Sequence, residues 1–291
     1  MMRARSGSTN GVWLILLWAV VVSTAGLFTR LIAADAWTVL FWRGLFGGGF
    51  IVAWILWQHQ GRTAAALRAI GPAGVLAATC STAATICFIN ALRLTSVADV
   101  MVIGASAPFV TAGLTWAASG EREGRITLLA STVALAGVGM TFNAAFASGQ
   151  LLGDLLALAM TVLISTTMVI IRLRRDVSMQ PAMALSALGC AVAVFPLARP
   201  LGNAPSDLVY LLLFGMVQFG LGMVLLALGT RLISATRSAL IGLLEVPLAA
   251  LWVWLAFGEM PVLMTWIGGG IIMAAVFGHA IFSKSTQLRA T

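Results

Sequence analysis

Charged side chains are scarce in this sequence of 291 residues, where they make up only 9% of the chain. Soluble domains carry roughly 25% charged residues, because they must present a wetted surface. Here 60% of the residues are hydrophobic. So little charge cannot cover a surface that faces water, which excludes an ordinary soluble protein. We therefore expect lipid to be the main solvent of this chain.

Lysine, histidine and cysteine are also rare: Lys284 is the one lysine, and there are two histidines and three cysteines. The net charge of +8 could suggest a nucleic-acid partner. The basic residues are scattered between apolar runs, however, without a basic face or an aromatic–basic motif, which argues against one. An odd number of cysteines inside apolar runs indicates no disulfide framework. His59 and His279 are isolated and lack metal-ligand spacing. The sequence predicts neither a metal nor a cofactor.

Long apolar runs are abundant instead. A membrane-spanning helix needs about 20 largely apolar residues, and ten segments of the chain qualify. They are 12–33, 36–57, 70–91, 97–118, 126–146, 152–171, 180–198, 208–229, 238–257 and 262–282. The connections are too short to hold a soluble domain. The sequence therefore predicts an all-α membrane protein in which ten transmembrane helices form one bundle.

The distribution of arginine predicts the orientation, because short cytoplasmic loops carry an excess of basic residues. With the N-terminus inside, the outer segments hold Arg30, Arg93 and Arg199, Arg43 lies within a span, and all other basic residues fall on the cytoplasmic side. We expect a multi-pass protein of a bacterial-type inner membrane, with both termini cytoplasmic.

The two halves of the chain resemble one another, which predicts a first repeat over residues 1–146 and a second over 147–291. The matching features are Ala91–Ser96 with Thr230–Ala235, Pro108 with Pro247, and Gly120-Glu121 with Gly258-Glu259. Each repeat holds five spans, and five is odd, so the second repeat must be inverted. Inverted repeats place a substrate site near the membrane midplane, between halves that move against each other. This geometry predicts a transporter with a central cavity.

These features, together with Trp18, Arg43 and the run Leu244-Glu245-Val246-Pro247, resemble the drug/metabolite transporter superfamily, specifically its ten-helix exporters with two EamA-type repeats. The run departs from that family's Leu-Glu-Pro motif by one inserted valine. The resemblance covers nearly the whole chain. It implies a bundle of inverted repeats around a central cavity and export of amino acids or related compounds, since bacterial exporters of aromatic amino acids and of threonine belong to this group.

Glu245 is the clearest intramembrane carboxylate in the sequence. A charge at the bilayer centre costs at least about 2.5–3.5 kcal/mol, so Glu245 should face a partner or water. It either takes up protons or attracts a substrate's amino group, or else it makes a structural hydrogen bond. Arg43 either binds a substrate carboxylate or holds backbone carbonyls. The two α-carbons differ in depth by roughly 10 Å, which leaves a direct Arg43–Glu245 pair open.

Other residues are candidates for the lining of the cavity, because a mostly apolar pocket with a few polar groups suits an amphipathic metabolite. They are Trp18, Phe41, Trp42, Phe88, Asn90, Met101 and Gln218. Pro108 and Pro247 lie in the middle of their spans, where proline kinks a helix. They are either symmetric hinges or fixed kinks.

The leading hypothesis is a secondary transporter that exports small metabolites by alternating access, with aromatic or other neutral amino acids as substrates. Export of cationic drugs or other metabolites is the alternative within the superfamily. A non-transporting membrane receptor and a membrane-embedded enzyme are alternatives of other classes. We expect no enzyme, because the sequence shows no paired catalytic groups. The expected partners are the substrate and the bilayer, and a monomer can suffice. Coupling to protons through Glu245 and downhill transport without a coupling ion both stay open.

Overall fold

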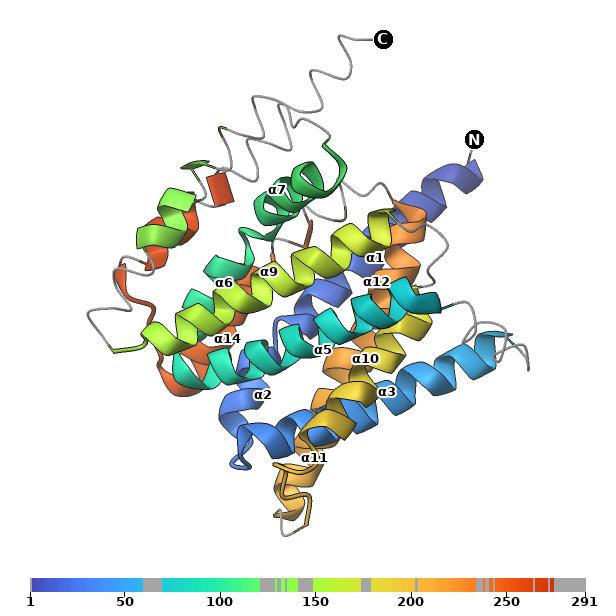
Figure 1. Cartoon of the computed structure of the whole chain (residues 1–291), viewed down its shortest axis with the longest axis horizontal. Coiled ribbons are helices and arrows are strands. Elements are labelled where there is room, and N and C mark those ends of the chain that lie inside the picture. Colours follow the sequence, from blue (N-terminus) through green and yellow to red (C-terminus); the bar gives the residue numbers. More distant parts are fainter. Residues whose placement is uncertain are drawn as a thin grey trace.

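The computed structural model describes residues 2–59, 70–120, 129, 132–133, 135–140, 149–173, 179–201, 204–233, 238, 241–242, 244–263, 265–271 and 273–274. All regular secondary structure among these residues is helical (Figure 1). The elements are α1 (Met2–Val22), α2 (Ala25–Leu31), α3 (Ala36–His59), α5 (Gly71–Leu94), α6 (Val97–Gly104), α7 (Ala107–Ser119), α9 (Leu151–Leu173), α10 (Met179–Val194), α11 (Pro205–Leu213), the π-helix η1 (Phe214–Leu221), α12 (Gly222–Leu232) and α14 (Glu245–Phe257).

Six helical stretches of the described chain are long and apolar enough to cross a membrane. They are Asn10–Leu31, Ala36–Gln58, Gly71–Leu94, Val97–Ala118, Leu151–Ile171 and Pro205–Thr230, and Pro181–Val194 and Glu245–Phe257 are shorter apolar helices. These eight helices coincide with predicted spans one to four and six to nine. Spans five and ten were predicted over 126–146 and 262–282, which lie partly outside the described residues. The predicted all-α membrane fold is confirmed.

The packing of the spans has the symmetry of two inverted repeats. The most extensive contacts are α5 with α9, α3 with α10 and α1 with α12, and α14 packs on α6. These contacts pair spans three and six, two and seven, one and eight, and four and nine. Exchanging every span for its counterpart five spans along the chain reproduces the same set of pairs. Such a pseudo-twofold relation is the architecture in which transporters hold a central site.

Spans four and nine also end in the same way. Gly120 follows α7 and Gly258 follows α14, each in the left-handed conformation, with φ of 70° and 68°. Their N–H groups donate to the carbonyls of Trp116 and Trp254, each at 2.8 Å. Glycine adopts this conformation without steric cost, so it is the usual residue after a helix end. The glycines of the two Gly-Glu pairs noticed in the sequence are therefore matching helix caps.

Four spans of this bundle are not continuous α-helices. Span one is interrupted at Ser23–Thr24, span four at Ala105–Ser106, span eight is π-helical over Phe214–Leu221, and α14 of span nine begins anew at Glu245. Pro108 and Pro247 lie in the first turns of α7 and α14. Proline lacks an N–H group, so it is tolerated where a helix begins. The two prolines thus follow interruptions of their spans, and their role as hinges or as fixed kinks stays a prediction.

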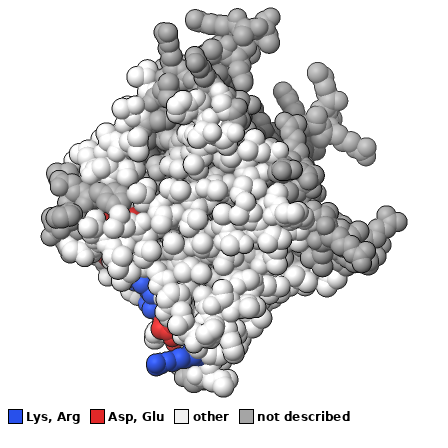
Figure 2. Space-filling model, viewed as in Figure 1, with Lys and Arg blue, Asp and Glu red and all other residues white. Residues whose placement is uncertain are grey.

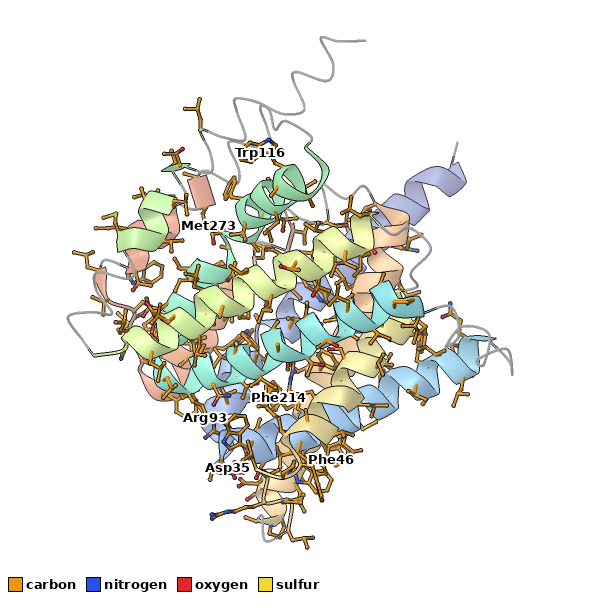
Figure 3. All side chains as sticks on the ribbon, viewed as in Figure 1. Asp35, Phe46, Arg93, Trp116, Phe214 and Met273 are labelled. Carbon is orange, nitrogen blue, oxygen red and sulfur yellow. The ribbon has the colours of Figure 1, made fainter. Side chains whose placement is uncertain are left out.

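Several of the charged side chains that the structure describes lie at one end of the bundle. Figure 2 shows a broad white face, with the coloured side chains confined to its edge. In Figure 3, Asp35 and Arg93 lie at this end, whereas Phe214 lies in the middle of the bundle. Spans one, three, seven and nine end here, and spans two, four, six and eight begin here. We call it the Glu259 end, after the residue that follows the cap of α14.

Candidate functional site

Two adjoining cavities lie between the two halves of the chain, with volumes of about 540 and 230 Å³. They share Phe88, Met160, Ile164 and Glu245 in their linings. Trp18, Met101 and Pro108 line the larger cavity, and Arg43, Gln218 and Phe219 line the smaller one. Because residues of both halves contribute, the cavities form one compartment at the interface of the repeats, which we call the central cavity.

The central cavity extends away from the Glu259 end. Its lining reaches Met168, near the far end of α9, and Leu226 in α12. Towards the Glu259 end it reaches Val100 and Met101, in the first two turns of α6. Both of these side chains are buried. The compartment is therefore placed asymmetrically, with buried residues between it and the Glu259 end.

Arg43 is held in the wall of the central cavity by aromatic rings. Its guanidinium carbon lies 5.0 Å from the ring centre of Phe214 and 4.5 Å from that of Phe219. These cation–π contacts stabilise a guanidinium that has lost its water. The close approach of α3 to η1 requires glycine, because a β-carbon on Gly47 or Gly215 would lie within 2.6 Å of a neighbouring phenylalanine. The helix packing therefore places the charge in the cavity wall.

Gln218 joins Arg43 to the interruption of span one. Its Oε1 accepts a hydrogen bond from Arg43 Nη2 at 3.3 Å, and its Nε2 donates to the carbonyl of Val22 at 3.0 Å. Val22 is the last residue of α1. Side chains of Ser23 and Thr24 cover the preceding carbonyls of Val20 and Val21. Freed backbone carbonyls need such partners in lipid, so one amide satisfies both the broken helix and the buried guanidinium.

Arg43 keeps unused hydrogen-bonding capacity. Its Nε is buried and has no hydrogen-bond partner among the described residues, although the side chain is only 6% exposed. A guanidinium can bind a carboxylate through two parallel hydrogen bonds. Arg43 thus lines the smaller cavity and has one donor, Nε, that no described residue uses.

Glu245 lies in the lining of both cavities, at the first residue of α14. In the described part of the chain, the one ion pair joins Arg30 to Glu259, so Arg43 and Glu245 do not pair with each other. The compartment thus contains a cationic and an anionic group that do not neutralise one another directly.

The other predicted cavity residues divide into two groups. Trp18, Phe88, Met101 and Gln218 line the central cavity, as Arg43 and Glu245 do. Phe41, Trp42 and Asn90 are placed elsewhere. Trp42 stacks on Phe46 at 5.0 Å and meets the edge of Phe41, while the Asn90 amide donates to the carbonyl of Ile86 in its own helix.

Sequence reasoning missed the contribution of α9. Met160 and Ile164 of this helix line both cavities, yet neither differs in type from a lipid-facing residue. Their spacing of four puts them on one helix face, but this signal marks a packed face as readily as a cavity.

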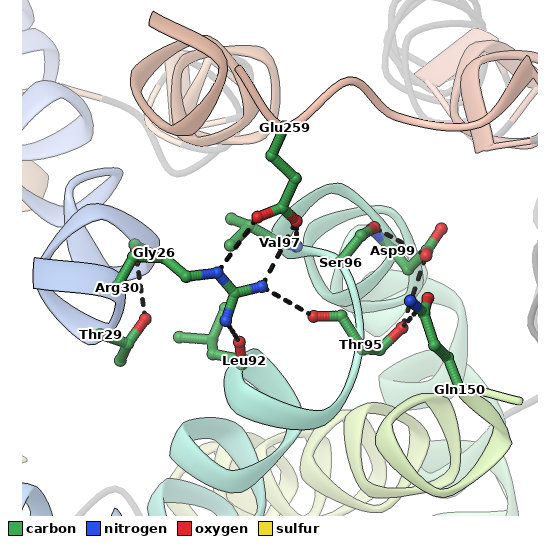
Figure 4. Close-up of polar contacts among 10 residues, drawn as sticks. All are labelled: Gly26, Thr29, Arg30, Leu92, Thr95, Ser96, Val97, Asp99, Gln150 and Glu259. Carbon is green, nitrogen blue, oxygen red and sulfur yellow. Dashed lines mark hydrogen bonds and ion pairs between the residues drawn. The ribbon is translucent and has the colours of Figure 1, made fainter. Parts of the chain in front are cut away.

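A polar network at the Glu259 end was missed as well (Figure 4). Arg30 of α2 donates from Nε and Nη2 to the Glu259 carboxylate, at 3.1 and 3.3 Å. The same guanidinium donates to the carbonyls of Leu92 and Thr95, and the N–H of Val97 donates to Glu259 at 3.4 Å. This set, called the Arg30 network, joins spans one, three and four to the turn after span nine. The repeated Gly-Glu turn was the available signal.

Metal binding has no support in the described residues, which contain no group of three or more His, Cys, Asp or Glu side chains suited to a metal ion. The chemistry that the cavity offers is binding of a small molecule through one guanidinium, one carboxylate and many apolar atoms.

Comparison with known proteins agrees with this architecture. Residues 9–143 and 151–280 each match the EamA-like transporter family. A solved crystal structure, titled only as that of a protein, superposes with a TM-score of 0.65 at 21% sequence identity, over 96% of this chain and 98% of that chain. At this identity it shows the fold alone. No curated protein matches the sequence significantly. Because the family is matched twice and over most of the sequence, this chain belongs to the EamA-like transporter family.

Proposed function

We propose that this protein is a secondary transporter that exports small zwitterionic metabolites, namely amino acids with aromatic or other neutral side chains. The observation that carries the proposal is the presence of Arg43 and Glu245 in one cavity without an ion pair between them. Arg43 would bind the substrate's carboxylate and Glu245 its ammonium group. Phe88, Met160 and Ile164 offer the apolar surface for the side chain.

The cavity lies between the two repeats, which supports an alternating-access cycle. In this proposal the protein lies in a bacterial-type inner membrane with both termini cytoplasmic, so that the Glu259 end faces outwards. The asymmetric position of the cavity then corresponds to loading from the cytoplasm. A single chain contains both halves of the cavity and suffices for the cycle.

Export of cationic drugs is the second candidate, and one observation favours it. The Arg43 guanidinium is already enclosed by Phe214 and Phe219 and bound to Gln218, whereas Glu245 faces the cavity. A hydrophobic cation would need the carboxylate alone.

Counterflow into liposomes separates these candidates. Purified protein is reconstituted with unlabelled amino acids inside, and uptake of each labelled amino acid of a panel is followed. We expect saturable exchange of one class, reduced at least tenfold by either Glu245→Gln or Arg43→Ala. Val162→Ala, on the outer face of α9, serves as the control.

Each other outcome has a distinct meaning. Exchange of a labelled lipophilic cation that needs Glu245 but not Arg43 would replace the amino-acid proposal by the drug proposal. Saturable binding of an amino acid without any exchange would indicate a receptor and overturn the transport function.

A further inference from the structure

Two aspartates at the Glu259 end form a buried cluster that the transport site does not use. Asp99 lies in the first turn of α6 and is 4% exposed, and Asp154 lies in the first turn of α9 and is fully buried. The hydroxyl of Thr95, also buried, lies between the two carboxylates. Ser96, Gln150 and Thr265 complete what we call the Asp99–Asp154 cluster.

The packing of α9 forces this approach. A β-carbon on Gly153 would lie 2.6 Å from Thr95 Cβ and 2.8 Å from the Leu94 carbonyl carbon. Only glycine allows the start of α9 to lie against this part of the chain. The next residue is Asp154, whose carboxylate is thereby held in contact with Thr95.

The hydrogen atoms available to the cluster can be counted. Asp99 accepts from the hydroxyls of Ser96 and Thr265, so both of its oxygens have donors. The Thr95 oxygen lies 2.7 Å from Asp154 Oδ1, 3.5 Å from Asp99 Oδ2 and 3.4 Å from Gln150 Oε1. A hydroxyl has a single hydrogen to donate. Thr95 therefore serves Asp154 Oδ1 and has no hydrogen left for a second acceptor.

Asp154 Oδ2 is the atom left over. It is buried and has no hydrogen-bond partner among the described residues. The charged groups nearest in the network do not compensate it, since Arg30 donates to the Thr95 carbonyl and to Glu259, and Arg93 donates to the carbonyls of Ile32 and Ala34. Asp99 adds a second negative charge. The positive end of α9 favours a carboxylate, but burying an unpaired charge costs more than this end supplies.

We propose that Asp154 is a proton-binding site whose occupancy is linked to closure of the Glu259 end. The carboxylate takes up one proton from solution as this end closes and becomes a neutral carboxylic acid, and the same proton is released when the end opens and water reaches Asp154. The proton's part in transport rests on the proposed function, whereas its binding does not.

The link to closure runs through Thr95, whose contact with Arg30 is drawn in Figure 4. Its carbonyl accepts from Arg30 and its hydroxyl donates to Asp154, so the Arg30 network and the cluster share one residue. Since the closed state binds one proton more than the open state, lower pH favours closure. The ratio of closed to open molecules should change up to tenfold per pH unit.

The first test measures proton binding directly, without any substrate. Infrared titration of the purified full-length protein is recorded in a Glu245→Gln background, to remove the carboxyl group of the cavity. We expect a band of a protonated carboxyl group that disappears in Asp154→Asn and remains in Asp207→Asn. Asp207 is a matched control, because it is a buried aspartate in the first turn of α11 at the same end. A band that persists in Asp154→Asn overturns the proposal.

The second test measures closure. Met101→Cys, in protein whose native cysteines are replaced, is modified from the Glu259 side with a membrane-impermeant maleimide over a range of pH. Rates are divided by those of Leu201→Cys, an exposed site in the loop between α10 and α11, to remove the titration of the thiol. We expect the normalised rate to rise with pH in wild type and to stay low and constant in Asp154→Asn.

Two results would contradict the link. An equal pH dependence in Asp154→Asn overturns it, and protection by sodium at constant pH that requires Asp154 would show a metal-cation site instead. If labelling follows the expectation but counterflow fails for every amino acid, the proton site stands and the proposed substrate falls.

Discussion

Replacing Glu259 by alanine should open the end of the bundle that the Arg30 network closes. The change removes the ion pair between Glu259 and Arg30, and it removes the acceptor for the Val97 N–H group. The side chain of Arg30 is 24% exposed and that of Glu259 is 29% exposed. Partial exposure limits the ion pair to about 1 kcal/mol or less, and the backbone hydrogen bond adds a similar amount. A total of about 1–2 kcal/mol corresponds to a 5- to 30-fold change in the ratio of closed to open molecules.

The assay is modification of Met101→Cys from the Glu259 side. Met101 is 6% exposed and lies at the edge of the central cavity nearest this end, so its labelling rate reports opening. We expect the rate to rise 5- to 30-fold in Glu259→Ala, as the free-energy estimate requires. Arg199→Ala is the control, because Arg199 is exposed at the same end and outside the network. A rate in Glu259→Ala equal to that of the control would refute the role of the network in closure.

Three further predictions concern stability. Gly153→Ala should lower the free energy of unfolding by about 1–3 kcal/mol, because the added β-carbon overpacks against Thr95. Thermal unfolding in detergent measures this, and Gly49→Ala, where a β-carbon meets no atom within 4 Å, should not destabilise the protein. Equal losses in the two variants would contradict the packing argument. Gln218→Leu should cost about 1–3 kcal/mol for each group left unpaired, namely Arg43 and the Val22 carbonyl, and Gln218→Glu should cost less, since it keeps the acceptor for Arg43. Burial raises the pKa of Asp35, but hydrogen bonds from the Thr38 hydroxyl and the N–H groups of Thr38 and Trp37 together lower it below its usual value. The resulting stabilisation is present above about pH 4 and is lost as the pH falls further. The melting temperature of Asp35→Asn should therefore depend less on pH between about 6 and 3 than that of the unchanged protein, and an equal dependence would contradict this assignment.

The fold could be predicted from the sequence because lipid imposes a simple rule. Every backbone polar group must be satisfied inside the span, so long apolar runs become helices. Eight of the predicted spans therefore coincide with apolar helices of the described chain. The repeated prolines and Gly-Glu turns added the symmetry, since both mark helix ends whose residue requirements are strict.

The lining of the central cavity was harder to predict, because it depends on which face of each helix turns inwards. Arg43, Gln218 and Glu245 were found since polar groups in lipid must face a partner or a cavity. Asn90 was a candidate for the same reason and Trp42 as a cavity-lining aromatic, yet Trp42 stacks on Phe46 and Asn90 bonds its own helix. Met160 and Ile164 are apolar on an apolar helix, so no sequence signal separates them from lipid-facing residues.

The Asp99–Asp154 cluster shows a different limit. Asp99 lies in the first turn of α6, where the positive end of the helix dipole favours a carboxylate. Asp154 has the same place in α9, but its contact with Thr95 depends on the closest approach of two helices at Gly153. Contacts of this kind come from tertiary packing and are invisible to local patterns.

Substrate protection of a cysteine in the central cavity tests most directly the claim that the substrate binds between the two repeats. Met160→Cys of α9 lines both cavities, and Leu201→Cys in the exposed loop after α10 is the control. In protein without its native cysteines, the amino acid that counterflow identifies should slow thiol modification of Met160→Cys with a half-maximal concentration equal to that of transport, and should leave Leu201→Cys unaffected. Modification of Met160→Cys at the same rate with and without saturating substrate would contradict the account.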